Sequence, residues 1–211
     1  MRWRLLALLL LAATGVAGAA DNAACELTQA SLDHIIRWEV GSQGLYSRKY
    51  TRPVCPACLS TASGVTIGVG YDLGHNVPGV ILQDWRTHPA RERLPAASGA
   101  GGQRAIDLAR AMQDVVTPWH LALAVFRETS IKAYCRRTQR AYPGAVRLPH
   151  NAFGSLVATT YNRGTSFVGP RRRELAVIRN ECVPTIDAEC LARQYESMPR
   201  LWAGTPVGNG L

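Results

Sequence analysis

The sequence predicts a predominantly helical α+β fold, in which a small glycine-rich β-region lies beside a helical lobe. The first observation is the segment from Ser63 to Gly74, where glycines interrupt a run of β-forming residues. That composition is typical of a short, sharply bent strand pair whose backbone something approaches closely. The second observation is that apolar residues recur at helical spacing through most of the remaining chain. A small β-region beside many helices is an α+β arrangement.

The N-terminus has the pattern of an export signal over residues 1–19. Two arginines precede the apolar run Leu5–Ala13, and Ala17-Gly18-Ala19 fits the small-x-small rule for signal cleavage. A retained anchor is the alternative, although the run is short for a membrane span, which needs around 20 residues. We therefore expect one mature domain over residues 20–211, with no stable membrane insertion after cleavage.

The first predicted helix begins at a cap formed by Thr28 or Ser31, continues to about Val40, and ends at Gly41 and Gly44. Three apolar side chains share one face of this helix with an acid: Leu32, Ile35, Ile36 and Glu39.

Glu39 thus extends the apolar face of the helix instead of its solvent face. A carboxyl group beside an apolar surface has its charged form disfavoured, which raises its pKa. A general acid that works near neutral pH needs such a pKa, so Glu39 is a candidate proton donor. The alternative is a buried structural glutamate paired with Arg37 or Arg163.

The glycine-rich β-region carries a second acid, Asp72, six residues after Thr66. In an extended strand this spacing places both side chains on one face, although each intervening glycine could mark a bulge or turn. A helix with one carboxylate, followed by a strand region with another, is a plausible glycosidase arrangement. The alternatives are that Asp72 is a turn residue and that Thr66 is only a strand residue.

The rest of the chain is predicted to be mostly helical. We expect a helical stripe over residues 105–116, followed by a helix that Thr117 caps, with Pro118 at its first position, and that runs to about Cys135. A further helix is expected from Asn151 to Tyr161, and two more begin at Pro170 and Thr185. Loops are expected at Pro53–Pro56 and Pro95–Gly102.

The six cysteines of an exported chain favour disulfide bonds: Cys25, Cys55, Cys58, Cys135, Cys182 and Cys190. Six cysteines allow fifteen pairings, and the sequence does not choose among them. Cys55 with Cys58 could close a tight loop, and Cys182 with Cys190 could flank the start of a late helix. A redox C-x-x-C site and a zinc site with nearby histidines are alternatives that the surrounding sequence fits poorly.

The chain has 24 basic and 15 acidic residues and a formal charge of +9. A basic exported protein could bind an anionic cell-wall polymer, an anionic membrane surface or nucleic acid. It could also simply carry a well-solvated basic surface. Charge alone does not choose the partner.

The segment Ser63–Gly74 has the form S-G-x-T-I-G-x-G-x-D-L-G and follows a helix that bears Glu39. In this it resembles the phage-type lysozymes of glycoside hydrolase family 24, most closely their pesticin-like muramidase branch. Leu156–Gly164, which ends in an aromatic-Asn-x-Gly, and Met198–Trp202 are similar to later segments of that family. The resemblance implies a lysozyme-like fold and covers most of the chain after about Ser31.

Two features depart from that family. Glu39-Val40-Gly41 stands where the family has Glu-Gly. The resemblance also leads us to expect a further arginine-rich helix after Gly210-Leu211, without which an apolar groove involving Trp202 would be partly uncovered.

The resemblance implies a peptidoglycan hydrolase, a muramidase that cuts the β-1,4 bond between N-acetylmuramic acid and N-acetylglucosamine. Glu39 would be the general acid, and Asp72, helped by Thr66, would guide the attacking water in an inverting mechanism. Asn162 and Arg163 would line the sugar cleft, unless they serve only to cap a helix. Tyr71 and Trp38 could stack on sugar rings, with core packing as the alternative.

We accordingly expect a periplasmic or secreted monomer whose partner is the glycan strand of peptidoglycan, with no nucleic-acid partner and no metal or organic cofactor. One alternative is a lytic transglycosylase, which needs a single glutamate. Another is a non-catalytic peptidoglycan-binding protein that has kept a lysozyme-like fold. The biological role, whether phage lysis, wall remodelling or antagonism, stays open at this stage.

Overall fold

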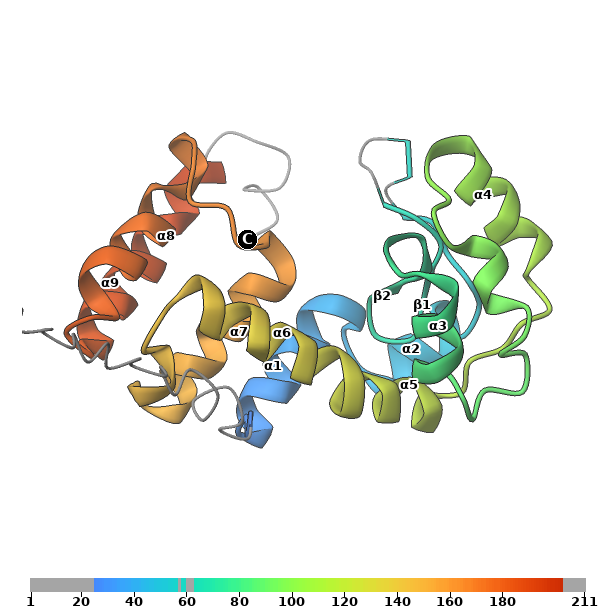
Figure 1. Ribbon diagram of the computed structural model, residues 1–211, viewed down its shortest axis with the longest axis horizontal. Coiled ribbons are helices and arrows are strands. Elements are labelled where there is room, and N and C mark those ends of the chain that lie inside the picture. The colour runs from blue at the N-terminus through green and yellow to red at the C-terminus, as the bar shows by residue number, and fades with distance from the viewer. Residues whose placement is uncertain (1–24, 57, 60–62, 203–211) are drawn as a thin grey trace, which may run out of the picture.

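The computed structural model describes residues 25–56, 58–59 and 63–202 (Figure 1). The described chain is predominantly helical and holds one two-stranded sheet, which confirms the predicted fold class at this level. The predicted signal peptide, residues 1–19, and the segment after Trp202 lie outside the described residues.

The α-helices and strands, in chain order, are α1 (Gln29–Val40), α2 (Gln43–Lys49), β1 (Thr66–Ile67), β2 (Tyr71–Asp72), α3 (Pro78–Asp84), α4 (Gly102–Ala111), α5 (Trp119–Val125), α6 (Lys132–Ala141), α7 (His150–Arg163), α8 (Arg173–Val177) and α9 (Ala188–Ser197). Short 3-10 segments are η1 (Leu73–His75), η2 (Leu94–Ala97), η4 (Ala145–Arg147), η5 (Pro170–Arg172) and η7 (Met198–Trp202). Two segments are π-helical, η3 (Phe126–Ile131) and η6 (Ile178–Cys182).

The described residues form two lobes with separate hydrophobic cores (Figure 1). The hairpin lobe contains β1, β2, α3 and α4, and Trp85 lies at its centre, 1% exposed. The helical lobe contains α1 and α6–α9 and packs around fully buried Leu156. The continuous helical run of α5, η3 and α6 joins them, because Val125 belongs to the first core and Phe126 to the second.

Helix α1 begins and ends largely as predicted. Thr28 caps its N-terminus by accepting a hydrogen bond from the Ser31 backbone N–H, and Gly41 ends it with a φ of 76°. Gly44, however, does not end a helix, because α2 starts at Gln43. The Ser42 hydroxyl accepts a hydrogen bond from Leu45 N–H at 3.2 Å and so caps a new helix directly after the turn.

Two side chains predicted to cap helices form hydrogen bonds with distant residues instead. Helix α5 begins one residue late, with Pro118 at the cap, because the buried Thr117 hydroxyl contacts His88 Nε2 at 3.1 Å. Helix α7 begins at His150, and the Asn151 side chain accepts a hydrogen bond from the Thr28 hydroxyl at 2.8 Å. In both cases a distant residue competes successfully for the side chain.

Three other boundaries also differ from the prediction. Helix α4 ends at Ala111, so the predicted stripe over residues 105–116 is only partly helical. Helix α9 is capped by Asp187 and not by Thr185. The predicted Pro95–Gly102 loop overlaps η2, whose Leu94 and Ala97 are fully buried.

All six cysteines pair: Cys25–Cys135, Cys55–Cys58 and Cys182–Cys190, with Cα atoms 6.0, 5.5 and 5.4 Å apart. Both local pairings raised from the sequence are confirmed. The remaining pair ties the chain just before α1 to α6. No helix in the described part of the chain has the length and apolar character needed to cross a membrane.

We predict that the Cys25–Cys135 disulfide stabilises the protein far more than Cys55–Cys58. The first closes a separation of 110 residues and the second a separation of 3. Loop-closure entropy then predicts losses of about 4–5 kcal/mol for the first pair and under about 2 kcal/mol for the second. Denaturant unfolding of the two double Cys→Ala variants measures this difference, and equal losses would contradict it.

A second prediction concerns the contact between α1 and α7. A Cβ at Gly154 would lie 2.6 Å from Ser31 Cβ, whereas nothing lies within 4 Å of a Cβ at Gly79. Gly154→Ala should lower stability, since overpacking costs about 1–3 kcal/mol. Gly79→Ala is the matched control and should be neutral or stabilising by up to about 1 kcal/mol. Thermal unfolding of both variants decides the matter, and a Gly154→Ala protein as stable as wild type would refute the close packing.

Candidate active site

The candidate site is built on the hairpin of β1 and β2. The strands are antiparallel, with Thr66 opposite Asp72 and Ile67 opposite Tyr71. The turn between them bends at two glycines with positive φ, Gly68 and Gly70. Directly opposed residues point to the same face of a sheet. Thr66 and Asp72 therefore share a face, but as opposed residues on two strands and not through their spacing along one extended strand.

Helix α1 delivers Glu39 to the turn of this hairpin. A Cβ at Gly70 would lie 2.8 Å from Glu39 Oε2 and 3.1 Å from the Tyr161 hydroxyl oxygen, so only glycine leaves room for both groups. The Tyr161 hydroxyl donates a hydrogen bond to the Val69 carbonyl at 2.7 Å. The carboxyl of Glu39 is thus enclosed between the hairpin turn and α7.

This enclosure changes the acidity of Glu39. Burial raises its pKa from 4.5 to about 7. An arginine partner would lower this pKa, but burial is the cause of the rise, which favours the proton-donor interpretation over an arginine-paired structural glutamate. A carboxyl with this pKa carries a proton in a large fraction of molecules at neutral pH and can donate it.

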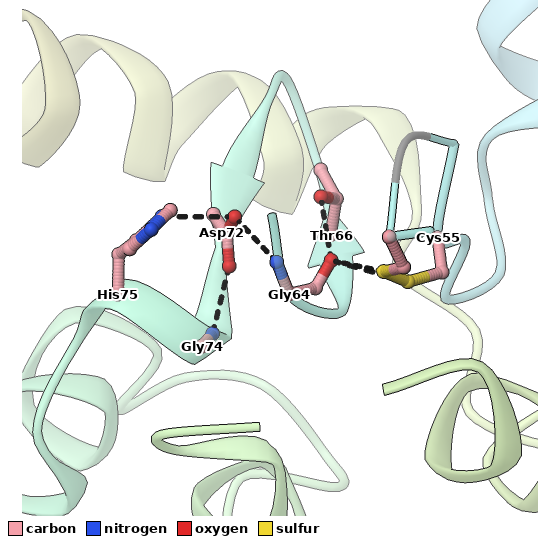
Figure 2. Close-up of a disulfide and its surroundings, with 7 residues drawn as sticks. Cys55, Gly64, Thr66, Asp72, Gly74 and His75 are labelled. Carbon is pink, nitrogen blue, oxygen red and sulfur yellow. Dashed lines mark hydrogen bonds and ion pairs between the residues drawn. A yellow bond between two sulfur atoms is a disulfide. The ribbon is translucent and has the colours of Figure 1, made fainter. Parts of the chain in front are cut away.

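The Asp72 carboxylate is held by three groups (Figure 2). Its Oδ2 accepts a hydrogen bond from Gly64 N–H at 2.9 Å and lies 3.0 Å from His75 Nδ1. Its Oδ1 accepts from Gly74 N–H at 2.8 Å. Asp72 therefore does serve as a turn residue, because its side chain caps the N-terminus of η1. The same bonds hold the carboxylate in one orientation.

Thr66 and a disulfide meet at the carbonyl of Gly64 (Figure 2). The Thr66 hydroxyl donates a long hydrogen bond of 3.4 Å to this oxygen. The sulfur atoms of Cys55 and Cys58 lie 3.6 and 3.5 Å from it. Gly64 therefore links the disulfide, Thr66 and Asp72 in one compact unit.

A cleft of about 470 Å³ opens beside the hairpin. The hairpin lobe contributes residues from Gly70 to Asn76 together with Val80 and Asp84 of α3, and the other wall comes from η3 and α6. Gly70 and Tyr161 both line the cleft, and the Glu39 carboxyl and the Tyr161 hydroxyl both lie beside the turn at Gly70. Asp72 lines it directly, whereas Glu39 and Thr66 are not among the lining residues. One candidate acid therefore borders the cleft, and the other lies beside Gly70, which lines it.

Of the two aromatic residues predicted to stack on sugar rings, one lines the cleft and the other does not. Tyr71 lines the cleft, but it is only 7% exposed, and its hydroxyl donates to Asp84 Oδ2 at 2.7 Å. Trp38 is 59% exposed on α1 and does not line the cleft. Tyr71 therefore combines the core role weighed for it with a place at the cleft.

Asn162 and Arg163, also predicted to line the cleft, do not line it. The Asn162 amide donates to the Ala158 carbonyl at 3.1 Å, one helical turn back. The Arg163 guanidinium lies 3.3 Å from Met198 Sδ and also donates to the Arg171 carbonyl. Arg163 thus faces the η5 and η7 segments of the helical lobe, because those segments supply acceptors that the sequence could not locate.

Sequence reasoning missed much of the far wall of the cleft. Tyr134 packs against Tyr161 with ring centroids 4.3 Å apart, and Ser130 lines the cleft from the π-helical segment η3. Burial, followed by the nearby Glu39, raises the pKa of Tyr161, so its hydroxyl remains a donor. π-helical turns are frequent at functional sites. The aromatic-Asn-x-Gly segment was the one signal that pointed to Tyr161.

The described residues contain no group of three or more His, Cys, Asp or Glu side chains placed to hold a metal ion. The chain matches no protein-family model, no curated protein and no solved structure at a significant level.

The raised pKa of Glu39 predicts a pH-dependent stability. The folded protein binds this proton up to about pH 7, but the unfolded chain releases it near pH 4.5. The cost of burying the charge is absent below pH 4.5, grows as the pH rises, and is complete above about 7. Glu39→Gln should remove that cost and stabilise the protein at pH 8 by on the order of 2–3 kcal/mol.

Thermal unfolding at pH 4.5 and pH 8 measures this effect. The variant and wild type should melt alike at the lower pH. Glu196→Gln, an exposed change on α9, is the matched control and should behave like wild type at both pH values. A Glu39→Gln protein without extra stability at pH 8 would show that Glu39 ionises freely in the fold.

Proposed function

We propose that this protein is a peptidoglycan hydrolase of the muramidase type, with a lysozyme-like fold, that hydrolyses the β-1,4 bond between N-acetylmuramic acid and N-acetylglucosamine. The observation that carries the proposal is a carboxyl group with a pKa of about 7, Glu39, enclosed against two residues that line an open cleft. The likeness of Ser63–Gly74 to the family 24 motif supports the same activity.

In the proposed reaction Glu39 donates its proton to the leaving glycosidic oxygen as the bond to the anomeric carbon breaks. A water molecule attacks that carbon from the opposite face and gives up a proton to Asp72. Asp72 suits this role because its carboxylate borders the cleft and is held in place by two backbone N–H groups. Inversion requires carboxyl groups roughly 6.5–9.5 Å apart, with room for the water between them.

The compartment in this proposal is the periplasm or the exterior of the cell. All six cysteines are paired, which fits an oxidising compartment. The basic composition, with a formal charge of +9, suits an anionic wall polymer.

A lytic transglycosylase is the second candidate, and one observation favours it. The bonds from Asp72 to Gly64 and Gly74, together with the His75 contact, explain this carboxylate without any catalytic role. A transglycosylase needs only Glu39, since the muramic acid hydroxyl replaces water and an anhydro sugar forms.

Mass spectrometry of products from purified sacculi tests the proposal. Wild-type protein should release fragments with reducing ends; anhydro ends would support the transglycosylase, and no cleavage would indicate a glycan-binding protein. Glu39→Gln should reduce turnover by about 10²–10⁴-fold, as expected for loss of a general acid. Glu196→Gln should retain full turnover.

The Asp72→Asn variant separates the two mechanisms. Hydrolysis should be largely lost while binding to sacculi persists, because binding does not need an activated water. Since an asparagine offers only one acceptor oxygen to the N–H groups of Gly64 and Gly74, the melting temperature must be measured on the same sample. A folded Asp72→Asn protein with wild-type turnover would remove Asp72 from the mechanism.

A further inference from the structure

A second cavity, of about 380 Å³, lies next to the cleft on the helical lobe. We call it the arginine pocket, and it is lined by Arg137, Arg140, Ala141, Thr165, Phe167 and Arg179. Two of its arginines come from α6 and the third from η6, which the Cys182–Cys190 disulfide closes at its end. No acidic residue is among those that line it.

The three guanidinium groups have no carboxylate partner among the residues that the structure describes. Other arginines do pair, for example Arg93 with Asp114. In the arginine pocket, aromatic rings hold two of the groups instead: Arg137 lies 4.8 Å from the centroid of Tyr134 and Arg179 lies 4.7 Å from that of Phe167. A guanidinium stacked on a ring keeps its N–H edge available for an oxyanion.

The arginine pocket continues the cleft. Arg137 lines both cavities, as does the α6 helix that carries it. Arg137 lies over the ring of Tyr134, and Tyr134 packs in turn against Tyr161. The hydroxyl of Tyr161 and the carboxyl of Glu39 both lie beside Gly70. A ligand seated in the cleft can therefore extend a branch into the arginine pocket.

We propose that the arginine pocket is a subsite for a free carboxylate of the stem peptide that branches from the muramic acid residues of the substrate. This inference rests on the proposed function and deepens it. Guanidinium groups recognise carboxylates through paired hydrogen bonds. Because the peptide is covalently joined to the sugar chain in the cleft, its carboxylate reaches the arginine pocket at high effective concentration.

Kinetics on two forms of one substrate test the inference: intact sacculi, and glycan strands whose stem peptides an amidase has removed. The Arg140→Gln/Arg179→Gln double variant should raise KM on intact sacculi by at least about fivefold, with kcat unchanged, as expected for partly exposed charge pairs. On peptide-free strands the wild type and the double variant should have the same KM.

The matched control is Arg104→Gln/Arg110→Gln on α4, which removes the same charge from the hairpin lobe. It should leave KM on intact sacculi within about twofold of wild type, because dissolved salt screens the attraction between a bound substrate and surface charges far from the site. An equal loss in both double variants would overturn the inference, because general charge attraction would then be sufficient. Equal KM for wild type and the pocket variant on intact sacculi would overturn it as well.

A binding measurement keeps this test separate from the proposed function. A soluble muramyl tetrapeptide is titrated into the wild-type protein and into the pocket variant by NMR. Chemical-shift changes at Arg140 and Arg179 that are absent when the peptide carboxylates are amidated support the subsite, even if no glycan is cleaved. Saturable binding of a phosphate-bearing wall polymer without any response to the tetrapeptide would reject the stem peptide as the ligand.

Discussion

The contact between Glu39 and the hairpin turn at Gly70 is the constraint on which the candidate site depends. Gly70 has a φ of 69° and no side chain, and any Cβ there would collide with the glutamate carboxyl and approach the Tyr161 hydroxyl closely. Because the turn fits so closely, α1, α7 and the hairpin meet at one point. The burial that results raises the pKa of Glu39 to about 7. The close approach at one glycine therefore contributes to the burial of a carboxyl group on a different element.

The hairpin that makes this contact is too short to be stable through its strands alone. Each strand has only two residues, and an isolated hairpin is marginal in water. The Asp72 carboxylate compensates by joining Gly64 and Gly74 across the lobe, and the Cys55–Cys58 disulfide packs against the carbonyl of Gly64. Asp72 therefore has a structural function whether or not it also activates water. A catalytic use would add to that function without replacing it.

The helical run α5–η3–α6 organises the opposite side of the cleft. It passes through both cores, and its π-helical part contributes Glu128, Thr129 and Ser130 to the wall of the cleft. Further along, α6 presents Tyr134 to the cleft and Arg137 to both cavities. Helix α6 thus carries part of the aromatic lining of the cleft and two arginines of the arginine pocket.

Much of this protein could be predicted from local patterns. The cap at Thr28, the apolar face that leads to Glu39, the strand pair and the two short-range disulfides depend on residues near one another in the chain. Contacts between distant segments determined the rest: the direction of Arg163 and the arginine pocket depend on acceptors and rings brought from other helices. Periodicity records which face of a helix is buried, but it contains no information about which distant side chain lies against that face.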